Sequence, residues 1–124
     1  MTESGRSPRI LARELYDDKS FDAYELREEL EQSVRWVNRK LLKTPLGSGD
    51  NTLLGRDNIS LIALATKQTN GVLTDEAAVV LFVVEKAPLE LVQFEYQAAE
   101  IGREFFDDKI ATDVFVVGKL NPNY

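Results

Sequence analysis

The chain has 124 residues, of which 44% are hydrophobic and 29% charged, and its formal net charge is −6; this predicts one folded domain with a hydrophobic core. It contains no cysteine and no histidine, which excludes disulfides, thiol nucleophiles, histidine catalysis and the usual zinc sites. The acidic balance disfavours nucleic-acid partners, and no apolar run is long enough to cross a membrane. The start, MTESGRSPRILARELY, lacks the apolar core of a secretory signal, so we expect a cytoplasmic protein.

The first 19 residues are predicted to form an N-terminal arm that contains a short helix. Ser7 would be its N-cap, and Pro8 would take the first helical position, where a missing backbone N–H is harmless. Residues 20–124 are then expected to form a single α+β domain.

A long amphipathic helix is predicted over residues 21–43. Asp22 and Glu25 have the spacing of a capping box, and Phe21 would pack on Leu26 as a hydrophobic staple. The apolar positions recur every three or four residues and form one stripe toward the core: Leu26, Leu30, Val34, Val37 and Leu41.

Trp36 lies off the centre of this stripe, which leaves two interpretations open: the edge of the core, or a contact with a partner. Residues 44–58 are predicted to be a loop. Its three glycines match the spacing of neither known phosphate-binding loop, so a connector is favoured over a nucleotide site.

The sheet core is predicted over residues 59–118. The segment 59–67 is apolar on both faces and should pair antiparallel with 76–86, which we place at the centre of the sheet. Asn70-Gly71 is a hairpin signal, although the connection predicted here is longer than two residues. Residues 112–118 are the third strand, followed by a tail, 119–124.

The segment 89–106 is ambiguous between a helix and a long loop. Its apolar residues step by three and four, which favours a helix, whereas Gly102 weakens the last turn. If it is helical, four acidic residues would form a charged face: Glu90, Glu95, Glu100 and Glu104.

Carboxylates are the metal ligands left open by the composition. The candidates are Asp17, Asp18, Asp75, Glu76, Asp107, Asp108 and Asp113. Adjacent acids such as Asp107 and Asp108 are typical of solvated turns. We therefore expect no metal, no cofactor and no catalytic residue. A small metal-dependent enzyme with a carboxylate site is kept as the least favoured of three hypotheses, and the other two follow from the resemblance described next.

The order of motifs from residue 58 to residue 118 is similar to that of a known domain. Asn58 precedes ISLIALATK; Thr74-Asp75-Glu76 precedes AAVVLFVVEKAP; and the segment closes on Ile101 and TDVFVVG. This resembles the small accessory domain that precedes the catalytic domain of a group of bacterial trypsin-like serine proteases. The chain departs from that domain at two positions. Gly102 stands where the domain has a proline, and Asp107 or Asp108 stands where it has a glycine.

The resemblance implies a non-catalytic interaction or regulatory domain associated with such a protease, with a protein partner. Thr112 and Asp113 are expected to hold the turn before the last strand through local hydrogen bonds. The alternative is a free-standing acidic adaptor or inhibitor, related to phage or defence loci. The candidate contact residues are Trp36, Tyr96, Phe106, Glu95 and Glu100.

Overall fold

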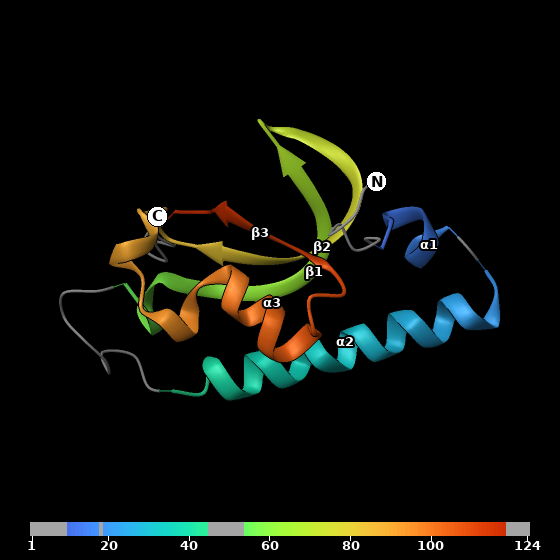
Figure 1. Cartoon of the computed structure of the whole chain (residues 1–124), viewed down its shortest axis with the longest axis horizontal. Coiled ribbons are helices and arrows are strands. Elements are labelled where there is room, and N and C mark those ends of the chain that lie inside the picture. Colours follow the sequence, from blue (N-terminus) through green and yellow to red (C-terminus); the bar gives the residue numbers. More distant parts are fainter. Residues whose placement is uncertain (1–9, 18, 45–53, 119–124) are drawn as a thin grey trace, which may run out of the picture.

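The computed structural model describes residues 10–17, 19–44 and 54–118. Over these residues, helices precede a three-stranded mixed sheet, which confirms the predicted α+β class (Figure 1). The candidate helix start at Ser7-Pro8 and the tail lie outside the described residues. The elements are α1 (Ala12–Tyr16), α2 (Phe21–Leu41), η1 (Arg56–Asn58), β1 (Ile59–Thr69), β2 (Val72–Val83), η2 (Leu89–Leu91), η3 (Phe94–Tyr96), α3 (Ala98–Phe106) and β3 (Ala111–Val116).

The segment around α1 is tied to the sheet. The N–H of Ala77 in β2 donates to the carbonyl of Ile10 (2.9 Å), and Leu11 forms an isolated bridge with Glu76. These contacts occupy the side of β2 just before β3 begins its own pairing at Ala78. Leu15 then reaches the main core, where it is fully buried.

The N-terminus of α2 differs from the sequence-based expectation. The N-cap is Ser20, whose hydroxyl accepts a hydrogen bond from the N–H of Ala23 (3.2 Å). Asp22 lies inside the first turn, so the predicted capping box is wrong. The predicted staple is also wrong, because the Phe21 side chain is exposed. The first N–H groups of a helix have no partner within the helix, and the Ser20 hydroxyl accepts from one of them in place of the expected Asp22.

The predicted apolar stripe of α2 is confirmed. Leu30, Val37 and Leu41 are buried, while Leu26 and Val34 pack against the same core from partly exposed positions. The helix ends at Leu41 and not at residue 43. There the guanidinium of Arg56 caps its C-terminus by donating to the carbonyls of Leu42 (3.1 Å) and Thr44 (2.9 Å).

The sheet has the order β1-β2-β3 among the described strands, with β1 antiparallel and β3 parallel to β2. The central position predicted for the most apolar strand is therefore confirmed. Successive residues of β2 point into two clusters: Val79, Leu81 and Val83 face the helices, and Ala78 and Val80 face the opposite side. Both sets are buried.

The hairpin turn is tighter than predicted. Thr69 pairs with Val72, so the connection is the two residues Asn70-Gly71. Both have positive φ, 54° and 79°. This is the signature of a type I′ turn, whose twist matches that of the flanking strands. The expected longer connection is wrong because β1 continues to Thr69 and β2 begins at Val72, four residues before its predicted start at residue 76.

The ambiguous segment contains both loop and helix. Two short 3₁₀ helices, η2 and η3, come first, and the α-helix α3 begins at Ala98. Gly102 lies within α3 and is required by packing: a Cβ there would lie 2.8 Å from the Thr112 methyl group of β3. Helix and strand can approach closely at this point because the residue has no side chain.

The hairpin bends away from α2 and α3 in Figure 1. A register shift between Thr66 and Gln68 marks the bend, as expected of a β-bulge. The bent end of β1 reaches β3 through two bonds: the Gln68 N–H donates to Asp113 Oδ2 (2.9 Å), and the Lys67 ammonium donates to the Thr112 carbonyl (3.2 Å). We call these two bonds the β1–β3 clasp.

Candidate functional site

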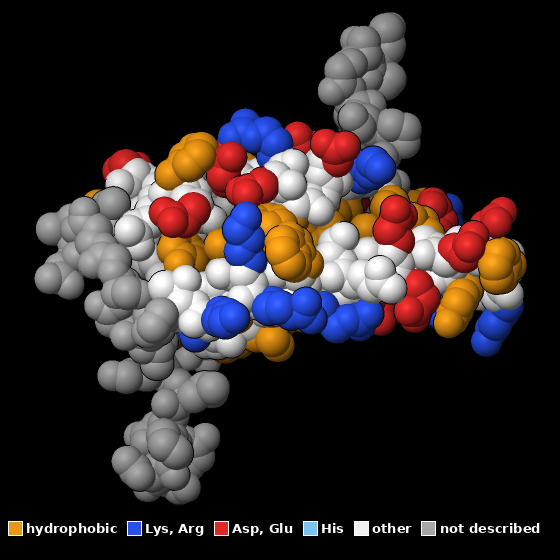
Figure 2. Space-filling model, turned by 90° about the horizontal axis from the view of Figure 1, so that it is seen from below, with side chains coloured by type: hydrophobic (Ala, Val, Ile, Leu, Met, Phe, Trp, Pro, Cys, Tyr) orange, Lys and Arg blue, Asp and Glu red, His pale blue; other side chains and the backbone are white. Residues whose placement is uncertain are grey.

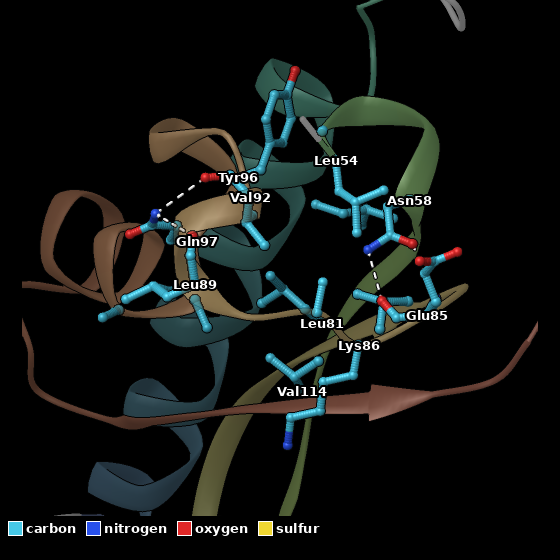
Figure 3. Close-up of a pocket in the computed structure, with 16 residues that line it drawn as sticks. Leu54, Asn58, Leu81, Glu85, Lys86, Leu89, Val92, Tyr96, Gln97 and Val114 are labelled. Atoms are coloured by element: carbon cyan, nitrogen blue, oxygen red, sulfur yellow. Dashed lines mark hydrogen bonds between the residues drawn. The ribbon is translucent and has the colours of Figure 1, made fainter. Parts of the chain in front are cut away.

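An apolar cavity lies between the helix-covered face of the sheet and the segment that leads into α3 (Figure 3). Its volume is about 240 Å³. The apolar walls come from both sides: Leu54, Ile59, Leu81, Val83, Leu89, Val92, Tyr96, Ala98 and Val114. The arrangement offers close van der Waals contact to an apolar group that enters from the mouth.

The far wall of the cavity is fixed by backbone and amide hydrogen bonds. Leu54 and Val92 form a parallel bridge, with the Leu54 N–H donating to the Leu91 carbonyl and the Gln93 N–H donating to the Leu54 carbonyl, both at 2.8 Å. The Gln97 amide donates to the carbonyls of Leu89 (3.3 Å) and Val92 (3.1 Å). These bonds hold an otherwise irregular segment in one conformation, so the cavity is preformed.

Polar groups stand at the mouth of the cavity. The Asn58 side-chain amide pairs with the backbone of Glu85, donating to its carbonyl (2.9 Å) and accepting from its N–H (3.0 Å). Figure 3 shows Asn58 and Glu85 at one side of the mouth, with Lys86 beside Val114. Within the described part of the chain, neither Glu85 nor Lys86 forms an ion pair.

Exposed apolar side chains adjoin the cavity along the same segment. Leu89 lines the cavity and is 62% exposed, while Leu91 and Phe94 are also exposed. We call these three residues the 89–94 ridge. Sequence reasoning missed it, because the spacing of the apolar residues over 89–106 favoured one continuous helix.

A wider and more open depression lies on the opposite face of the sheet. Tyr16, Leu73, Phe82 and Phe115 contribute to its wall. Asp113 also lines it, but its carboxylate is already used by the β1–β3 clasp and by the Val114 N–H (2.9 Å). The Asp113 carboxylate is therefore engaged within the sheet on both of its oxygens.

The predicted contact residues do not form one site. Trp36 is 51% exposed and lies on α2, and Glu95 is exposed on η3. Tyr96 and Phe106 are 7% and 5% exposed, so the expectation that they are surface aromatics is wrong. Both belong to the main core, Tyr96 at the end of η3 and Phe106 at the end of α3.

The predicted acidic face is also divided. Glu90 and Glu95 precede α3, and the two glutamates on α3 itself have cationic neighbours. Glu100 pairs with Arg103 one turn later, and the Glu104 carboxylate lies 3.9 Å from the Lys40 ammonium of α2. The pairing with Glu100 raises the pKa of Arg103. Acidic charge on this segment is thus partly balanced within the molecule.

The motif residues that carry the protease resemblance bond to the sheet backbone. Thr74 Oγ1 donates to the Lys67 carbonyl at the bulge (2.9 Å), and Asn58 and Asp113 act as described above. Thr112 and Asp113 lie inside β3 and not in a turn before it. Their expected local role is therefore only half right: one Asp113 oxygen bonds to the next residue, and the other reaches β1.

The carboxylates considered as metal ligands do not gather. Among the residues that the structure describes, which exclude Asp18, no group of three or more acidic side chains is placed to hold a metal ion. In the same residues, no helix has the length and apolar character to span a membrane.

Comparison of the chain with known protein families, curated proteins and solved structures finds no match.

Proposed function

We propose that this chain is a non-catalytic protein-binding domain that contacts its partner through the cavity and the 89–94 ridge. The observation that supports this most is the exposure of three large apolar side chains beside a preformed apolar cavity. Apolar surface rimmed by polar groups is typical of protein contact sites. A pocket that takes one anchoring side chain of a partner is a frequent centre of such sites.

The size of the cavity favours a side chain over a free small molecule. Pockets for small ligands usually measure roughly 300–1,000 Å³, and this cavity measures about 240 Å³. A cavity of roughly 150 Å³ can hold a benzene ring. One aromatic or large aliphatic side chain therefore fits the available space.

The resemblance supports a bacterial trypsin-like protease domain as the partner, encoded in the same or a neighbouring reading frame. In this proposal the chain positions or regulates the protease and performs no reaction itself. The absence of cysteine supports a cytoplasmic setting. The alternative of an acidic adaptor has less support, because Glu100 and Glu104 have cationic neighbours.

Calorimetric titration of the chain with that protease domain tests the proposal. Leu89→Asp places a charge on the 89–94 ridge and should weaken binding about 30-fold or more, as expected for a hot-spot residue. Leu73→Asp at the hairpin is the matched control, since Leu73 and Leu89 are exposed to 64% and 62%. Equal affinities for the two variants would contradict the assignment of the surface, and no binding by the native chain would contradict the partner.

A second variant separates the cavity from the ridge. Ala98→Leu adds bulk at the cavity wall and leaves the exposed side chains of the ridge unchanged. If a partner side chain enters the cavity, this variant should weaken binding about tenfold while the chain remains folded by circular dichroism. Unchanged affinity would show that the cavity is not the anchor site.

A further inference from the structure

The solvent-facing side of α2 carries a line of charge that changes sign at its middle. The exposed positions 22, 25, 29, 32, 36 and 39 of α2 follow one another in steps of three and four, so they lie along one stripe, and exposed position 43 comes two residues after the end of the helix. In order, they are Asp22, Glu25, Glu29, Gln32, Trp36, Arg39 and Lys43. Figure 2 looks onto this side and shows acidic side chains gathered toward one end and basic ones along the other half.

The charges of this stripe have no partners among the described residues. The ion pairs in that part of the chain are Lys40 with Glu104 and Glu100 with Arg103, and neither involves the stripe. Trp36 is half exposed in the middle of the basic half. The stripe therefore offers unpaired charges of both signs and an apolar contact.

Two copies of the stripe that run in opposite directions place acidic side chains of one copy against basic side chains of the other. A two-fold axis at Gln32 places residues that are equally far from it opposite each other in an antiparallel helix pair. Glu25 and Arg39 both lie seven residues from Gln32, roughly 10 Å along the helix. Glu29 then lies opposite Arg35, because both are three residues from Gln32, and Asp22 faces the end of the partner helix near Lys43. A parallel arrangement would instead oppose like charges.

We propose that the stripe is a self-association surface, on which a second copy of this chain docks its own α2 in the antiparallel direction. The contact is isologous, as in most homodimers. One helix face from each copy makes a small interface, so the dimer is expected to be weak and to form only at high protein concentration. This surface is separate from the cavity and does not depend on the proposed function.

The helix dipole does not account for the stripe. It favours acids in the first turn and bases in the last turn, and its effect falls off beyond them. Glu29 lies more than two turns from the start of α2, yet the acidic half continues to it. The net charge of −6 opposes association at long range, but at about 0.15 M salt this repulsion is screened beyond about 8 Å, whereas contact pairs persist.

Charge reversal with analytical ultracentrifugation tests the proposal. In the proposed dimer, position 25 of each copy faces position 39 of the other copy. Glu25→Arg therefore places two basic side chains against each other in both contacts, and Arg39→Glu places two acidic side chains there. Each variant should weaken the dimer at least about tenfold, because two attractive contacts become repulsive. An equimolar mixture of the two variants restores both opposite-charge contacts and should dimerise as the native chain does.

The outcomes are distinct. Both positions are exposed, and far-UV circular dichroism confirms that each variant is folded before mixing. The single tryptophan gives an independent readout on the native chain, since its emission should change with dilution through the dissociation constant. A native chain that stays monomeric up to about 1 mM, where even a contact of millimolar affinity would be populated, overturns the proposal. So does a dimer that persists in both variants, or a mixture of variants that fails to associate.

Discussion

Single polar side chains complete the sheet by bonding to backbone groups that the strands leave unpaired. The Asn38 amide donates to the Ile62 carbonyl (2.7 Å) and accepts from the Ile62 N–H (3.2 Å), which joins α2 to β1. Asn58 makes the same two-way contact with Glu85, and Asp113 holds the bent end of β1. Because unpaired buried backbone groups are costly, these residues limit how the sheet can bend.

Asp113 provides the most direct test of this role. Asp113→Ala should lower the free energy of unfolding by about 1–3 kcal/mol, because the partly buried Gln68 N–H loses its acceptor. Urea denaturation measures the change. Asp75→Ala is the control, since it removes the same charge from an exposed position of β2. Equal losses in the two variants would mean that the β1–β3 clasp contributes nothing beyond charge.

Tyr16 is expected to make the free energy of unfolding decrease at alkaline pH. Its pKa is raised above 10.0 because the ring is partly buried and Glu31 repels the phenolate, while Arg27 opposes the shift. The folded chain thus holds the phenol proton more tightly than the unfolded chain. The contribution of Tyr16 is constant below about pH 10 and falls as the pH rises above it.

Tyr16→Phe removes this dependence. The stability difference between the native chain and the variant should shift in favour of the variant between about pH 8 and about pH 11, and urea denaturation at both values measures it. A difference that stays constant across this range would contradict the raised pKa. Absorbance titration of the phenolate in both proteins provides a second reading.

At the scale of elements, the contact between α3 and β3 decides the effect of a helix substitution. Intrinsic propensity alone favours Gly102→Ala by about 1 kcal/mol. The added Cβ, however, would lie 2.8 Å from the methyl group of Thr112, a β-branched residue with restricted rotamers. We therefore expect a net destabilisation of about 1–3 kcal/mol from overpacking.

A double-mutant cycle identifies the cause. Thr112→Ser removes the obstructing methyl group, so Gly102→Ala should be less destabilising in that background than in the native chain. Thermal denaturation of the four proteins gives the coupling. A stabilising effect of Gly102→Ala alone would show that helix propensity dominates at this position.

Element types were predictable where the apolar period was strong. The stripe of α2 and the continuous run of β2 indicated a helix and a central strand, because burial imposes those patterns. The start of β2 was not predictable in the same way. Val72 and Leu73 pair with β1 in an exposed hairpin end, where backbone pairing and the type I′ turn set the boundary and burial does not.

At the scale of the whole molecule, the candidate site was largely hidden from the sequence. The cavity depends on Leu54 meeting Val92 and on Gln97 bonding to two carbonyls of its own segment, and neither contact follows a local rule. Tyr96 and Phe106 were expected at the surface as aromatic contact residues, whereas tertiary packing buries both of them. Trp36 remains a predicted contact residue.

The central proposal is that this molecule acts by binding a protein through one end of its helix-covered side. Amide hydrogen exchange of the chain, free and bound to the trypsin-like protease domain, tests it most directly. The account predicts slower exchange in residues 85–99 on binding, with no change at the hairpin tip, 69–73. Protection confined to the hairpin or to the opposite face of the sheet, or no protection at all, would contradict it.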